Sequence, residues 1–201
     1  MQIGLEPPYL LVKPGVSEED FYRLADEDSD WEYLDGRIIM HSPASNRHED
    51  LFSFLMTLLR GYLDERGTGI VRGSRYPMRL DAKWSPEPDI LVITEARFER
   101  LTERRLERPA DLVVEIVSES DPTLDYREKL PRYREAGIPE IWFVDRFRKK
   151  CFGKHRPSEA IVPKRFRPVA CLRVWSRASG SKFPGSGKAI FRRRSPVFVR
   201  F

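Results

Sequence analysis

The chain has 201 residues, of which 40% are hydrophobic and 33% are charged, and its formal net charge is +5 at pH 7. These values are typical of a soluble globular protein with one core, and the length is short for two domains. No run approaches the roughly 20 apolar residues of a membrane span, and the N-terminus does not have the plan of a secretory signal. The two cysteines, Cys151 and Cys171, have neither metal-ligand spacing nor a disulfide pattern. We therefore expect a cytoplasmic protein without a membrane partner.

The net charge conceals a sharp division along the chain. Residues 146–201 hold 17 Lys and Arg against one acid, Glu159, whereas residues 1–145 hold 19 basic and 30 acidic residues. Such asymmetry is typical of a basic arm that binds nucleic acid, but residues 148–201 contain no motif that reads DNA. Apart from a strand-like run at residues 170–175, Pro, Ser, Gly and Arg are scattered there without period. We interpret this atypical basic tail as the product of a shifted reading frame; regular strands of the tail within the central sheet would count against that hypothesis.

The first predicted elements are a short helix and a hairpin. Residues 16–25 favour a helix with Ser17 as its N-cap and acids in its first turn. Strand-like runs follow at residues 31–34 and 37–40. They are joined by Asp35-Gly36, which is a strong hairpin signal.

Strands and helices are predicted in turn along the rest of the chain. The longest helix covers residues 47–65, with Gly67 after its end. Its apolar stripe consists of Leu51, Phe54, Leu55, Leu58 and Leu59. Strands are predicted at residues 69–72, 76–80, 89–94, 111–118 and 138–145. A charged helical or loop stretch leads to residue 108, and a helix over residues 125–136 is stopped by Gly137. This order predicts an α/β or α+β fold with a mixed central sheet.

Two acids break the apolar pattern of these strands. Glu115 lies in a run dominated by β-branched residues, where an ionised carboxylate is costly unless a partner or a metal neutralises it. Asp89 leads directly into the apolar run at residues 90–93. On adjacent strands, these carboxylates and the Ile116 carbonyl would supply the oxygen ligands that Mg²⁺ prefers, with Mn²⁺ as a substitute. Such a metal lowers the pKa of an attacking water, and a nearby lysine orients that water or stabilises developing charge in phosphodiester hydrolysis.

A known nuclease motif matches these residues. Pro88-Asp89 and Glu115 fit the PD-(D/E)XK pattern, except that Val117 occupies the position of the lysine. Residues 33–48 and 125–145 resemble the Uma family of restriction-endonuclease-like proteins. The resemblance places that family in the PD-(D/E)XK nuclease superfamily. Together these motifs are specific, whereas the Pro-Asp pair alone is a weak signal.

The resemblance covers about residues 17–147 and implies a nuclease domain at residues 1–147. The implied fold is α/β and restriction-endonuclease-like, with a mixed central β-sheet flanked by helices. In the family the catalytic lysine has moved to the following helix, and Lys129 matches that position. The resemblance thus implies Asp89, Glu115 and Lys129 as catalytic residues, with Asp89 and Glu115 holding the metal and the Ile116 carbonyl as a further ligand.

Three more residues are weaker candidates for the same site. Asp125 lies one helical turn before Lys129, so it would hold the ammonium in place, although a cap or a surface pair is an equal alternative. His48 and Glu49 open the long helix and are expected to face the same cleft. Pro131 departs from the family pattern, because a proline inside the lysine helix removes a hydrogen bond. Either that helix begins later than predicted or it is kinked near Lys129.

The combined spacing predicts a Mg²⁺-dependent endonuclease that hydrolyses phosphodiester bonds in DNA. A homodimer is expected by analogy, because cutting two strands needs two sites. The alternatives for single residues are a turn cap for Asp89 and a structural ion pair for Glu115, and Lys129 taken alone is typical of a solvated helix residue. The alternative function is a non-catalytic nucleic-acid-binding or regulatory protein that retains the nuclease fold, and a third alternative is a damaged gene product that folds poorly.

Overall fold

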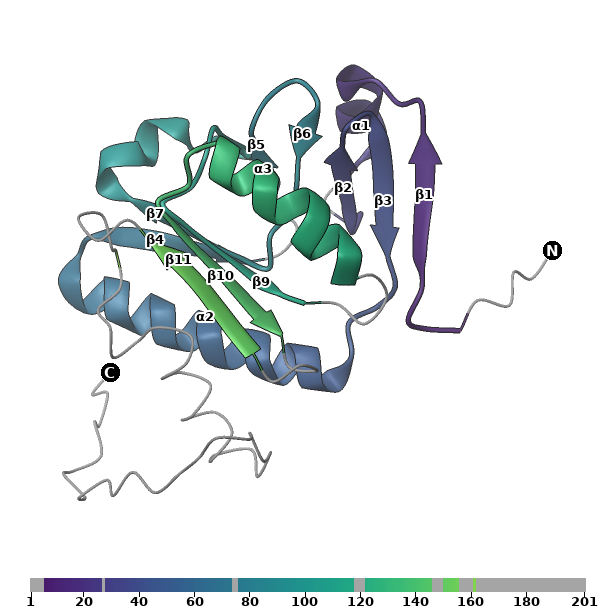
Figure 1. Ribbon diagram of the computed structural model, residues 1–201. Coiled ribbons are helices and arrows are strands. Elements are labelled where there is room, and N and C mark those ends of the chain that lie inside the picture. The colour runs from purple at the N-terminus through teal and green to yellow at the C-terminus, as the bar shows by residue number, and fades with distance from the viewer. Residues whose placement is uncertain are drawn as a thin grey trace.

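The computed structural model describes residues 6–26, 28–73, 76–117, 122–145, 150–155 and 161. Within these ranges the chain forms a five-stranded central sheet, a four-stranded N-terminal sheet and a two-stranded pair (Figure 1). Helices α2 (Asn46–Arg66) and α3 (Leu130–Glu135) lie on opposite faces of the central sheet. None of the helices in these ranges has the length and apolar character needed to span a membrane.

The remaining helical elements are short. They are α1 (Glu18–Leu24), the 3₁₀ helix η1 (Glu95–Arg100) and the π-helical turn η2 (Leu124–Lys129), which leads directly into α3. The N-terminal sheet consists of β1 (Leu10–Pro14), β2 (Trp31–Leu34), β3 (Arg37–His41) and β6 (Trp84–Ser85). The central sheet consists of β4 (Gly69–Gly73), β7 (Ile90–Thr94), β9 (Leu112–Ile116), β10 (Glu140–Asp145) and β11 (Lys150–His155). Strands β5 (Met78–Arg79) and β8 (Leu106–Glu107) form the separate pair.

Local contacts confirm the predicted N-terminal elements. Ser17 is the N-cap of α1, and its side chain accepts a hydrogen bond from the Asp20 N–H at 3.1 Å. Asp35 and Gly36 both have positive φ in the turn between β2 and β3, as a tight hairpin requires. Gly67 ends α2 in the left-handed conformation. The predicted boundaries at these points therefore follow from backbone chemistry.

The central sheet is mixed. Its strand order is β11-β10-β9-β7-β4. Strands β9 and β10 are parallel, whereas the other neighbouring pairs are antiparallel. A parallel pair needs a crossover connection, and η2 with α3 provides it over one face of the sheet (Figure 1). This arrangement is the mixed sheet flanked by helices that the sequence predicts.

Strand β9 divides its side chains between two cores. Val114 belongs to the same core cluster as Leu55 of α2. Val113 belongs to the opposite cluster, which includes Tyr133 of α3. Because alternate residues of a strand share a face, Glu115 lies on the face that η2 and α3 cover.

The N-terminal sheet packs on the segment that carries Lys129. Helix α1 covers one part of this sheet, where the ring of Phe21 stacks on Tyr33 with 5.3 Å between their centroids. Leu34 forms a separate cluster with Leu124, the first residue of η2. The sheet and η2 are therefore held together by apolar contact, and both approach the same side of the central sheet.

The segment around Lys129 corrects the predicted continuous helix over residues 125–136. The Leu130 N–H donates to the Asp125 carbonyl, five residues earlier, which widens the turn to the π type. Pro131 then lies in the first turn of α3, where its missing N–H is not needed. The proline thus marks an interruption of the helix near Lys129. The α-helix begins at Leu130, later than predicted, which is the first of the two alternatives that the sequence left open.

Strand β11 lies in the segment for which the sequence predicts an atypical basic tail. It pairs antiparallel with β10, from Glu140 opposite His155 to Asp145 opposite Lys150. The central sheet therefore continues beyond residue 147, and a regular strand at this position counts against a shifted reading frame for residues 150–155. The strand-like run predicted at residues 170–175 lies outside the described residues.

Two glycines provide a test of the packing. A Cβ on Gly69 would lie 2.6 Å from the Ile93 carbonyl oxygen, whereas a Cβ on Gly61, inside α2, would meet no atom within 4 Å. We predict that Gly69→Ala lowers the free energy of unfolding by about 1–3 kcal/mol through overpacking. Gly61→Ala should raise it by about 0.5–1 kcal/mol, because alanine loses less backbone entropy in a helix. Urea unfolding measures both, and equal effects at the two positions would contradict the sheet register described here.

Candidate active site

Glu115 lies at the centre of a buried polar site. It accepts a hydrogen bond from the Tyr133 hydroxyl at 2.5 Å, and the Lys129 Nζ lies 3.4 Å away; both contacts are at Oε1. Tyr133 comes from α3 and Lys129 from the last position of η2, so the crossover over this face brings both side chains to the strand. The cost of burying the carboxylate is therefore offset by direct partners.

Lys129 joins three carboxylates. Its Nζ lies 2.6 Å from Glu32 Oε1, 3.4 Å from Glu115 Oε1 and 3.9 Å from Asp125 Oδ1. All four side chains are almost fully buried. The structure thus brings Lys129 to Glu115 although Val117 stands at the motif position of the lysine, and it brings Asp125 to the same ammonium.

Asp89 lies at the start of β7, beside the end of β9. Its Oδ2 accepts a hydrogen bond from the Ile116 N–H at 2.6 Å. In an extended strand the N–H and C=O of one residue point to the same side, so the Ile116 carbonyl faces the edge at which Asp89 lies. The structure therefore brings together the two predicted strand acids and the predicted backbone ligand at one end of β9.

The first turn of α2 reaches the same edge. His48 Nε2 lies 3.2 Å from Asp89 Oδ1, and His48 Nδ1 lies 3.5 Å from Glu49 Oε1. The side chains of Asp89 and His48 are each 17% exposed, whereas that of Glu49 is 56% exposed. His48 thus belongs to the partly open side of the site, and Glu49 lies at the surface beside it.

The charges of the buried groups depend on one another. Burial and the nearby Asp89, Asp125 and Glu32 carboxylates raise the pKa of Glu115 well above its usual value, against the opposing effect of Lys129. Burial acts to lower the pKa of Lys129, but the Glu115, Glu32 and Asp125 carboxylates outweigh it and raise that pKa. Lys129 is therefore held as an ammonium ion.

Glu32 and His41 form a second charged pair next to Lys129. Burial acts to raise the pKa of Glu32, but Lys129 and His41 outweigh it and lower the pKa to about 2. His41 Nε2 lies 3.1 Å from Glu32 Oε2. Burial acts to lower the pKa of His41, whereas the hydrogen bond and the charge of Glu32 outweigh it and raise that pKa above 6.5. Glu32 is thus a carboxylate over the whole physiological range of pH.

Sequence reasoning missed Glu32 and Tyr133. Glu32 lies in a short hairpin strand in which polar residues normally face solvent, and only its position between the apolar residues Trp31 and Tyr33 was a local signal. Tyr133 repeats with the apolar residues of its helix, a pattern that indicates a core position. Its ring is in the core, but its hydroxyl is a partner of Glu115, which no local pattern indicates.

The donor set at this edge suits a hard divalent cation. The groups are carboxylate and carbonyl oxygens. Repulsion from Asp89 adds to burial in raising the pKa of Glu115, and a cation between the two carboxylates would offset that repulsion. Within the described residues no three His, Cys, Asp or Glu side chains form a ready metal cluster. A Mg²⁺ ion is commonly held by one or two carboxylates with water and substrate oxygens completing its shell, so the residues present fit it.

Comparisons with known proteins identify the family. A family model, Uma2, described as "Putative restriction endonuclease", matches residues 18–174. The chain belongs to the Uma2 family. The match runs past residue 147, and the family and fold together support a nuclease. No curated protein matches the sequence.

A solved structure shows the same fold as this Uma2 protein. It is the crystal structure of a "putative nuclease belonging to DUF820" from Anabaena variabilis ATCC 29413. The TM-score is 0.63 at 15% sequence identity, and the match covers 80% of this chain and 98% of that chain. The predicted restriction-endonuclease-like fold is therefore confirmed.

The Glu32–His41 pair predicts how stability depends on pH. Because the folded protein raises the pKa of His41 above 6.5, the pair stabilises the native state fully below the unfolded pKa, and this contribution is lost as pH rises through the folded pKa. His41→Gln keeps a donor for Glu32 but does not titrate. Urea unfolding from about pH 5.5 to about pH 9 should show the wild type losing its stability advantage over the variant as pH rises. A difference that is constant with pH would contradict the pairing.

Proposed function

We propose that this protein is a Mg²⁺-dependent endonuclease that hydrolyses phosphodiester bonds in DNA. The observation that carries the proposal is the approach of the Lys129 ammonium to within 3.4 Å of Glu115, from an element other than the strand. Two strand acids and a lysine over the same sheet face are the groups that metal-assisted hydrolysis requires. A homodimer is part of the proposal by analogy, because a break in both strands needs two sites.

The chain's own donors orient the two strand acids. The Ile116 N–H donates to Asp89 and the Tyr133 hydroxyl donates to Glu115, so each carboxylate is fixed by a second group. Asp89, Glu115 and the Ile116 carbonyl would hold Mg²⁺, or Mn²⁺ as a substitute. Mg²⁺ bound there would lower the pKa of the attacking water and offset negative charge on the phosphate.

Lys129 acts as a donor and a positive charge rather than as a base. The carboxylates around it keep it protonated, so its ammonium orients the water and stabilises the charge that develops on a phosphate oxygen. Asp125 lies on the same turn, 3.9 Å from Nζ, and limits the directions in which the ammonium points. His48 contacts Asp89 from α2 and restrains that carboxylate on the partly exposed side of the site.

One observation favours a second candidate, a nucleic-acid-binding or regulatory protein that retains the nuclease fold. Oε1 of Glu115 already contacts Tyr133 and Lys129, and both oxygens of Asp89 have partners within the chain. In such a protein the buried charges would stabilise the fold and no metal would be required. The two candidates therefore differ in metal binding as well as in cleavage.

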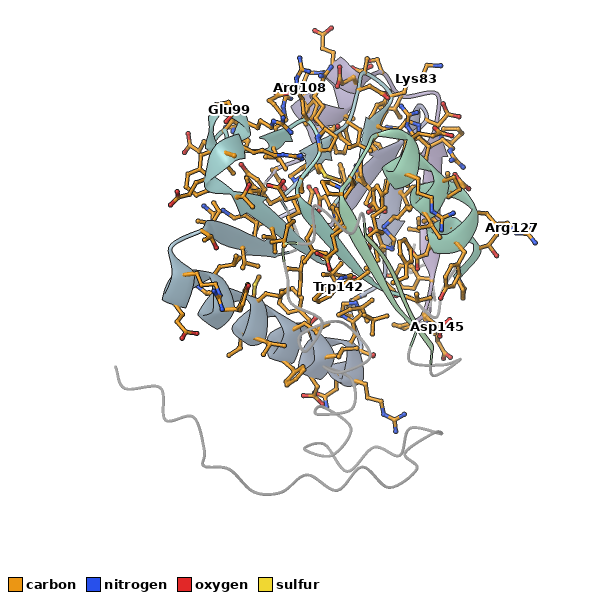
Figure 2. All side chains as sticks on the ribbon, turned by 60° about the vertical axis from the view of Figure 1, so that its left-hand side comes forward. Lys83, Glu99, Arg108, Arg127, Trp142 and Asp145 are labelled. Carbon is orange, nitrogen blue, oxygen red and sulfur yellow. The ribbon has the colours of Figure 1, made fainter. Side chains whose placement is uncertain are left out.

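Cleavage of supercoiled plasmid tests the proposed activity. We predict nicking or linearisation with Mg²⁺ or Mn²⁺ that EDTA abolishes. Lys129→Ala should reduce the rate by about 10²–10³-fold, the usual effect of removing one charge-stabilising donor. The matched control is Lys83→Ala, which removes an exposed lysine from the turn before β6 (Figure 2). Folded wild-type protein that leaves DNA intact, or equal losses in the two lysine variants, would contradict the assignment.

Metal binding gives a readout that does not depend on cleavage. Mg²⁺ should raise the unfolding temperature of the wild type, because a ligand that binds only the native state stabilises it. Asp89→Asn and Glu115→Gln each remove one ligand charge and should reduce the increase. Glu99→Gln is the matched control, since its side chain is 66% exposed on η1, at the opposite end of β7 from Asp89 (Figure 2). An equal increase in unfolding temperature in all four proteins would contradict the proposed metal site and favour the non-catalytic function.

A further inference from the structure

We propose that Glu32 is a positioning residue for Lys129: its carboxylate holds both the lysine ammonium and the chain that precedes Asp89, so that the N-terminal sheet completes the active site. This inference rests on the proposed nuclease function and assigns a role to a residue of a different sheet. Glu32 belongs to β2, whereas Glu115 belongs to β9 and Lys129 to η2.

One oxygen of Glu32 accepts hydrogen bonds from two parts of the site. Oε1 lies 2.6 Å from Lys129 Nζ and 3.1 Å from the backbone nitrogen of Glu87. Glu87 lies two residues before Asp89. A single atom from the N-terminal sheet therefore sets the separation between the lysine and the segment that leads to the first strand acid.

The carboxylate of Glu32 is itself fixed. Its other oxygen, Oε2, lies 3.1 Å from His41 Nε2, on the neighbouring strand of the same hairpin. Glu32 is only 2% exposed, so water does not compete for its oxygens. A group that is held on both oxygens and shielded from solvent is preorganised to hold a third partner in one place.

Lys129 needs such a restraint more than an ordinary helical lysine does. Its ammonium is carried on a flexible four-carbon stem, which begins at the end of a π-helical turn. Asp125 lies on that same turn and moves with it, and Glu115 is both farther away and shared with Tyr133. Among the three carboxylates described around Nζ, Glu32 alone ties the lysine at a short distance to a separate element.

A double-mutant cycle separates positioning from a merely structural ion pair. We expect Glu32→Gln to reduce kcat for Mg²⁺-dependent plasmid cleavage by about 10- to 100-fold, as small displacements of reacting groups do, with little change in KM. In a Lys129→Ala background the same change should have almost no further effect, because Glu32 acts through the lysine. Equal losses in both backgrounds, or an unchanged kcat, would overturn the proposal.

The matched control is another ion pair that joins the N-terminal segment to the rest of the chain. Glu18 of α1 contacts Arg79 of β5 at 2.5 Å, so Glu18→Gln removes a similar carboxylate away from Lys129. This variant should cleave at the wild-type rate. Glu32→Asp keeps the charge on a shorter side chain and should recover part of kcat; it carries the same comparison if Glu32→Gln does not fold.

A chemical readout keeps the proposal testable apart from nuclease activity. Acetic anhydride should modify the buried Lys129 slowly in the wild type and in Glu18→Gln, but several-fold faster in Glu32→Gln, with the exposed Lys83 as the internal reference in peptide mass spectra. Wild-type protein that does not cleave, yet shows this dependence on Glu32, would refute the nuclease function and retain Glu32 as the residue that holds Lys129. Equal modification in all variants would overturn the role of Glu32.

Discussion

The buried ammonium of Lys129 is the constraint on which the rest of the site depends. Three almost inaccessible carboxylates surround it, and they come from β2, β9 and η2. Removing one member of a buried ion pair leaves an uncompensated charge, which costs far more than the loss of a surface pair. Apolar contacts such as Leu34 with Leu124 tolerate small shifts, whereas this pairing requires each element to lie at a definite position. The N-terminal sheet and the central sheet are therefore fixed relative to each other by charge.

The same cluster carries more negative than positive charge. Burial is the largest cause of the raised pKa of Glu115, and the Asp89, Asp125 and Glu32 carboxylates act in the same direction, against the opposing effect of Lys129. In the chain by itself, the hydroxyl of Tyr133 helps to satisfy Glu115. This imbalance supports the proposed cation at the edge where Asp89 and the Ile116 backbone meet. Apolar residues of similar volume often stabilise a fold at least as well as buried ion pairs do, so the cluster is weak evidence for a purely stabilising role.

The sequence predicts what short-range chemistry determines. The hairpin at Asp35-Gly36 and the end of α2 at Gly67 follow from backbone conformations that few residues adopt. Glu32 was not predictable in this way, because its burial is created by η2, which arrives from a distant part of the chain. The π-helical turn before Pro131 was only half predictable, since a proline signals an interruption but does not specify its geometry.

The fold explains how Lys129, the lysine of the proposed nuclease site, reaches the strand acid from far along the chain. A lysine at position 117 would share the face of Glu115, and that face is the one that the crossover between β9 and β10 must cover. A side chain pointing down from η2 therefore enters the same space that a side chain from the strand would fill, and Val117 joins the apolar core instead. At this position the placement of the lysine depends on the π-helical turn that carries it. Glu32, 2.6 Å from Nζ on β2, restrains the ammonium from outside the crossover at a shorter distance than Glu115 does.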